Sequence, residues 1–82
     1  MLYDIYRVEM SHLGYTDIII AWSGASLRSH WGCKVDTVNA QTGRDAADIY
    51  FNRTHQVFPW GGMSTLETGV YCVTLNKHAS WL

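Results

Sequence analysis

The sequence has little charge, and its basic residues do not cluster. Charged side chains make up 16% of the 82 residues, against about 25% in typical soluble domains, and the net charge is −1. The six basic residues are spread along the chain: Arg7, Arg28, Lys34, Arg44, Arg53 and Lys77. Proteins that bind nucleic acid present a concentrated basic surface to the phosphates. The dispersed charge therefore argues against nucleic-acid binding.

The sequence also lacks a long apolar run and has only two cysteines. No segment approaches the roughly 18–20 apolar residues of a membrane span, and the N-terminus has none of the features of a secretory signal. These absences predict a cytoplasmic protein that does not enter a membrane. In a reducing compartment, the two cysteines are expected to be free thiols rather than a disulfide.

Apolar and aromatic side chains are abundant by contrast. There are four Trp, five Tyr and two Phe, and apolar residues make up 48% of the chain. This content argues against disorder, and the length predicts a single domain spanning 1–82. A domain of this size buries only about 60–65% of the surface of its unfolded chain. We therefore expect an exposed apolar surface that contacts a protein partner or a second copy of the chain.

Four segments have the residue pattern of β-strands: 2–10, 17–22, 30–40 and 69–76. The second segment is continuously apolar and rich in β-branched residues, which is typical of a central strand covered on both faces. The third segment alternates, so that Cys33, Val35 and Thr37 share one face. This alternation predicts that Cys33 points into the core.

The segment 36–54, DTVNAQTGRDAADIYFNRT, changes from a strand pattern to a helix pattern around Gly43. Thr42 is expected to cap the helix, with Asp45 three residues later in place of the usual Glu of a capping box. A helical stripe follows and consists of Ala46, Ile49, Tyr50 and Arg53. The helix is predicted to end near Thr54. Because the segment has neither of the glycine-spaced phosphate motifs, we interpret it as a fold element and not as an anion site.

The segment 55–68 contains the only proline and a glycine pair, and it is predicted to be a loop of about 12–14 residues. The order strand, strand, strand, helix, strand predicts an α+β fold. In this fold, an antiparallel sheet of about four strands carries one helix on one face. The alternative is that the two strands that flank the helix pair in parallel, through a right-handed crossover.

Histidine and cysteine residues suggest a possible metal or thiol site. His30 and Cys33 have the spacing of many zinc ligands, and Cys72 with His78 or His55 could complete a tetrahedral set. A small zinc- or thiol-dependent enzyme that uses His30 and Cys33 is therefore one alternative function. The second half of the set is loosely spaced, and a Cys33 in the core would be out of reach. We therefore expect no metal and no other cofactor.

Catalytic motifs are missing around the remaining candidate residues. Ser23 lies in AWSGA, which is not the GxSxG nucleophile elbow. Asp45 and Asp48 share a helix face, and this position is typical of a solvated first turn that favours the helix dipole. We therefore expect a protein that is not an enzyme.

Aromatic residues in loops are the best candidates for binding a partner. In VFPWGG, Phe58 and Trp60 flank a proline that limits backbone freedom, and a rigid aromatic on a loop is typical of a binding anchor. Trp81, near the C-terminus, and Trp31, beside the zinc-like spacing, are the further candidates. The competing interpretation is that such rings fold back over a sheet face that one short helix cannot cover.

The third strand, the segment VNAQTGRDAADIYF and the closing strand resemble small sheet-plus-helix proteins encoded by phages and other mobile elements. Some of these are anti-CRISPR proteins, and the resemblance implies an inhibitor that occludes a surface of a host protein. Many anti-CRISPR proteins are strongly acidic mimics of nucleic acid, and the near-neutral charge here departs from that pattern. The leading hypothesis is a non-enzymatic protein-binding module of this inhibitor type. A homo-oligomeric structural subunit is the third hypothesis.

Overall fold

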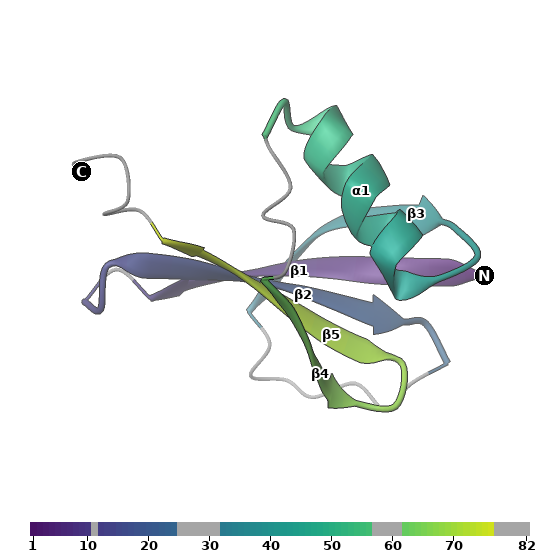
Figure 1. Ribbon diagram of the computed structural model, residues 1–82, viewed down its shortest axis with the longest axis horizontal. Helices are drawn as coiled ribbons and strands as arrows, with labels where there is room; N and C mark the ends of the chain where they lie inside the picture. Colours follow the sequence, from purple (N-terminus) through teal and green to yellow (C-terminus); the bar gives the residue numbers. More distant parts are fainter. Residues whose placement is uncertain (11, 25–31, 57–61, 77–82) are drawn as a thin grey trace.

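The computed structural model describes residues 1–10, 12–24, 32–56 and 62–76 (Figure 1). Within these ranges, the elements along the chain are β1 (Leu2–Met10), β2 (Tyr15–Trp22), β3 (Cys33–Asn39), α1 (Gly43–Arg53), β4 (Met63–Glu67) and β5 (Val70–Asn76). The strands form one sheet in the order β3-β1-β2-β5-β4, and every neighbouring pair is antiparallel. The predicted α+β class is therefore confirmed. The parallel alternative is not adopted, because β3 is not a neighbour of β5.

Strand β2 lies in the middle of the sheet and is buried on both faces. Ile18 and Ile20 belong to the core cluster that includes Ala46 and Phe51 of α1, and Figure 1 shows α1 lying across this face. Ile19 belongs to a second cluster, which contains no residue of the helix. The continuous apolar run at 17–22 had predicted a strand covered on both faces, and the structure confirms it.

Helix α1 begins and ends through contacts within a few residues of each terminus. At the start, the Thr42 hydroxyl accepts a hydrogen bond from the Asp45 backbone N–H at 3.1 Å, as the capping pattern predicted. At the end, the Thr54 hydroxyl donates to the Tyr50 carbonyl at 3.1 Å. His55 follows with a φ of 58°, the left-handed conformation common just after a helix. The predicted helix end near Thr54 is therefore confirmed.

The first turn of α1 lies close to β5 because Gly43 has no side chain. A Cβ atom at Gly43 would lie 2.3 Å from the Tyr71 ring, a distance that no real contact permits. Farther along the helix, the buried face consists of Ala46, Ala47, Tyr50 and Phe51. Glycine is therefore needed here for close packing of a helix on a strand.

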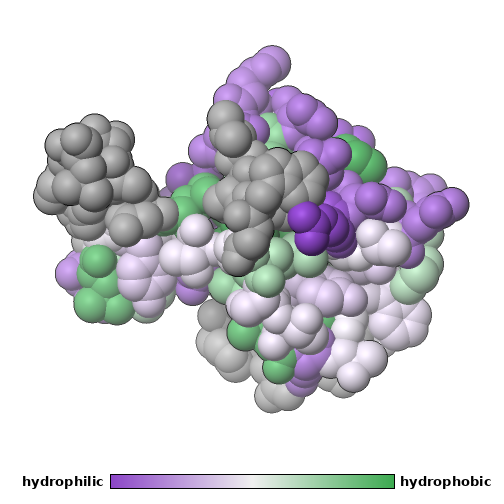
Figure 2. All heavy atoms as spheres, in the orientation of Figure 1, coloured by the Kyte–Doolittle hydropathy of each residue, from purple (hydrophilic) through white to green (hydrophobic). Residues whose placement is uncertain are grey.

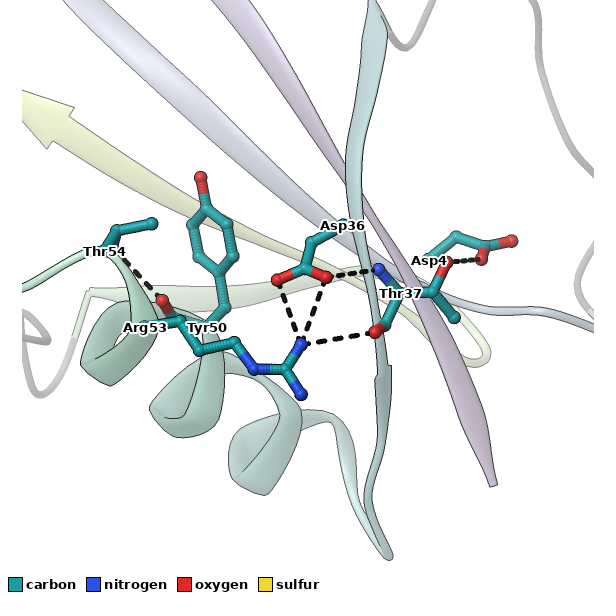
Figure 3. A network of polar contacts seen from close by, with 6 residues as sticks. All are labelled: Asp4, Asp36, Thr37, Tyr50, Arg53 and Thr54. Carbon is teal, nitrogen blue, oxygen red and sulfur yellow. Dashed lines mark hydrogen bonds and ion pairs between the residues drawn. The ribbon is translucent and has the colours of Figure 1, made fainter.

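A polar network connects the last turn of α1 to the edge of the sheet (Figure 3). Arg53 donates from Nη1 to both carboxylate oxygens of Asp36 at 3.1 Å. The neighbouring Thr37 hydroxyl donates to Asp4 of β1 at 3.1 Å, and Lys34 forms an ion pair with the same carboxylate at 3.2 Å. Such partly exposed ion pairs contribute only about 0.2–1 kcal/mol each, so the network orients the helix more than it stabilises the fold.

The predicted core position of Cys33 is wrong. Ile5 pairs with Asp36 but Tyr6 pairs with Lys34, so Val35 is an extra residue in β3. This β-bulge breaks the alternation on which the prediction depended. Because β3 is also an edge strand, Cys33 is exposed to solvent.

The predicted loop at 55–68 is wrong in its second half. Strand β4 lies there and pairs with β5 through a tight turn at residues 68–69, where Gly69 has a φ of 76°. A positive φ in a two-residue turn is a common feature of β-hairpins. The segment MSTLE is short and only weakly alternating, so its strand conformation depends on pairing with β5 more than on its own residues.

We expect the substitution Thr42→Ala to destabilise the protein by about 1 kcal/mol, because the hydrogen bond to the Asp45 N–H is lost. Chemical denaturation monitored by circular dichroism measures this change. Gln41→Ala, at the exposed preceding residue, is the matched control and should unfold as the wild type does. Equal stability of the two variants would contradict a role for the cap.

Candidate interaction surface

Most of the predicted site residues lie outside the described part of the chain. They are His30, Trp31, Phe58, Trp60, His78 and Trp81. Their roles as binding anchors or metal ligands therefore stay predictions. The structure does place Cys33, His55 and Cys72.

The two cysteines do not form one metal site. Cys33 lies on β3 and Cys72 on β5, with β1 and β2 between them. Three strand spacings separate them by roughly 14 Å, whereas two zinc-bound sulfurs lie within about 5 Å of each other. His55 is exposed, in the turn that ends α1. Among the described residues, no three His, Cys, Asp or Glu side chains gather in a way that could hold a metal ion.

The two thiols also differ in their surroundings. Cys72 is 8% exposed and belongs to the second core cluster, next to Ile19. Burial raises the pKa of the Cys72 thiol, and the nearby carboxylate of Asp17 raises it further. That carboxylate accepts a hydrogen bond from the Thr74 hydroxyl at 2.7 Å. Cys72 is therefore a core residue whose thiolate is disfavoured, whereas Cys33 is exposed.

We expect one thiol of the folded protein to react with a disulfide reagent at pH 7–8 well before the other, because only the thiolate attacks and only Cys33 is accessible. The absorbance of the released thiol measures both rates. The variant Cys33→Ser should lose the fast phase, and Cys72→Ser should keep it. Two fast thiols in the folded wild type would contradict the burial of Cys72.

Charged groups on the helix side of β1 are engaged with one another. Arg7 pairs with Glu9, and this hydrogen bond raises the pKa of the Arg7 guanidinium. Glu9 also accepts a hydrogen bond from the buried Thr16 hydroxyl at 2.9 Å. The contact between Thr16 and Glu9 connects β1 to β2.

Exposed apolar residues lie at one end of the sheet, on both of its faces. Four of them, with exposed fractions between 38% and 57%, form what we call the apolar end: Met1, Leu2, Trp22 and Leu66. Trp22 pairs with Tyr3, so Trp22 and Leu2 lie on opposite faces of the sheet. Ser23 N–H donates to the Leu2 carbonyl at 2.9 Å, and Trp22 N–H donates to the Gly69 carbonyl at 2.7 Å, which connects β1, β2 and the β4–β5 turn. In Figure 1, the N-terminus, the end of β2 and this turn lie on the same side of the molecule.

Trp22 is the largest residue of the apolar end and is held by two glycines. A Cβ atom at Gly24 would lie 2.5 Å from Cη2 of the indole, and one at Gly69 would lie 3.3 Å from the Trp22 Cβ. The ring therefore packs on bare backbone and still leaves 38% of the residue exposed. On the face shown in Figure 2, apolar residues form small separate patches among polar ones.

The sequence pattern predicts Trp22 as the last residue of a buried strand, so the exposure of this residue was not expected. The residue that ends a central strand lies at the rim of the sheet, where neighbouring elements cover it less. The following Ser23 and Gly24 are the only signal in the sequence that the strand stops there.

Comparison of the chain with protein-family models, curated proteins and solved structures found no significant match. In the part of the chain that the structure describes, no helix combines the length and the apolar character needed to cross a membrane.

Proposed function

We propose that the chain is a non-enzymatic protein-binding module that binds a partner protein through the apolar end, with Trp22 as its anchor. The observation that supports this proposal most directly is an exposed tryptophan packed beside two glycines, at the end of the sheet that also carries three other exposed apolar residues. Tryptophan is enriched among the few residues that carry most of the binding energy of an interface. A ring that is already held in place loses little conformational entropy when it docks.

The size of the apolar end favours a different protein over a second copy of the chain. A large side chain has roughly 200 Å² of surface. With exposed fractions near one half, the four residues together expose on the order of 400 Å² of apolar area. An obligate homodimer buries roughly 1,000–2,500 Å² on each partner, whereas a transient complex can bury less than about 600 Å² on each. We therefore propose that the partner is a protein with an apolar pocket that accepts the Trp22 ring.

Binding of this kind would cover the surface of the partner. That is the mode of inhibition implied by the resemblance to phage-encoded inhibitors, and an inhibitor role in the cytoplasm is part of this proposal. Phe58, Trp60, Trp81 and Trp31 remain proposed as additional contacts. Their support is the sequence pattern alone.

We expect Trp22→Ser to weaken partner binding at least about 30-fold, which corresponds to the roughly 2 kcal/mol of a binding hot spot. The tagged full chain captures proteins from bacterial lysate, mass spectrometry identifies them, and calorimetry then measures the affinity for the purified partner. Leu13→Ser is the matched control, because Leu13 is 55% exposed but lies at the β1–β2 turn, at the opposite end of the sheet.

Capture of the same proteins by Trp22→Ser and by the wild type would contradict the proposal, as would the absence of any specifically captured protein. Light scattering of the purified chain at two concentrations tests the alternative of self-association. A dimer that Trp22→Ser dissociates and Leu13→Ser does not would assign the apolar end to a second copy of the chain, against the proposed partner.

A further inference from the structure

We infer that Gly24 is a positioning residue for Trp22, with Gly69 as a second support, and that the missing side chain at residue 24 sets the orientation of the exposed ring. This inference rests on the proposed function, because it concerns how the anchor of the apolar end is presented. It also has a test that does not require the partner.

The contact between Gly24 and Trp22 involves the outer edge of the indole. A Cβ atom at Gly24 would lie 2.5 Å from Cη2, 2.6 Å from Cζ2 and 2.9 Å from Cε2. Real Cβ contacts do not occur at these distances, so even an alanine at residue 24 requires the ring to move. The ring occupies this position only because residue 24 has no side chain.

The backbone conformation does not account for a glycine at residue 24. The glycines with positive φ in the described chain are Gly14, Gly32 and Gly69, and Gly24 is not among them. Other residues can therefore adopt the backbone conformation at this position without left-handed strain. The contact with Trp22 is therefore the constraint that favours glycine at residue 24.

Gly69 supports the same side chain from the neighbouring hairpin. A Cβ atom there would lie 3.3 Å from the Trp22 Cβ and 3.6 Å from Cε3, and the Gly69 carbonyl accepts the Trp22 N–H at 2.7 Å. Its φ of 76° means that a substitution at Gly69 would also strain the turn. Gly24 is therefore the position where ring orientation can be changed without altering the backbone.

The atoms nearest to Gly24 belong to the far end of the indole, so the ring can swing away from an added methyl group. We therefore expect Gly24→Ala to change the orientation of Trp22 while the chain stays folded. The measurement is fluorine NMR of the full chain labelled with 5-fluorotryptophan, in which the Trp22 signal is assigned by its loss in Trp22→Phe. The Trp22 signal should shift in Gly24→Ala, and the signals of the other tryptophans should stay in place.

Gly62→Ala is the matched control, because Gly62 is exposed and lies just before β4. It adds the same methyl group and should leave the Trp22 signal unchanged. An unchanged Trp22 signal in Gly24→Ala would overturn the inference. So would a shift of equal size in Gly62→Ala.

The consequence for binding is measured with the same bacterial lysate as above. We expect Gly24→Ala to reduce the amount of captured partner at least about tenfold, and Gly62→Ala to leave it unchanged. A shifted Trp22 signal with full capture would overturn the positioning role in binding. Loss of capture in Trp22→Ser would in that case still support the proposed function, so the two failures can be told apart.

Discussion

Burial of the central strand β2 on both faces is the constraint on which the rest of the structure depends. Ile18 and Ile20 point to the face that α1 covers, and Ile19 points to the other face. Full burial of one such side chain contributes about 1.5–3 kcal/mol, whereas each partly exposed ion pair contributes about 0.2–1 kcal/mol. Apolar burial therefore decides where the helix lies. The pair between Arg53 and Asp36 then aligns it with β3 (Figure 3).

Apolar side chains nevertheless remain exposed at the end of the sheet. The 11-residue helix covers one face only, and its first turn packs on Tyr71 of β5, close to this end. Trp22, at the last position of β2, is the cross-strand neighbour of the buried Tyr3 but stays partly exposed itself. Its ring packs beside the backbone of Gly24, where a side chain would displace it, and Gly69 lies beside its Cβ. Neighbouring backbone thus supports the Trp22 side chain without covering it, and the proposed contact with another protein rests on this combination.

The parts of the fold that could be predicted are those that depend on neighbouring residues. The hydrogen bond from the Asp45 N–H to Thr42 spans three residues, and the apolar run of β2 identifies a central strand without knowledge of its partners. The site was harder to predict. Cys33 lies outside the core on the edge strand β3, and neither the bulge at Val35 nor the pairing of β4 has a pattern of its own in the sequence.

By itself, the sequence determined the α+β class, the position of the helix and the central place of β2, because capping and apolar periodicity act over short stretches of chain. Only the tertiary structure decided the order of the strands, the exposure of Cys33 and the separation of the two cysteines. It also decided how Trp22 is held, since Gly69 is 47 positions away and reaches the ring only through the pairing of β2 with β5. Contacts between distant residues depend on how the whole core packs, and no local pattern encodes them.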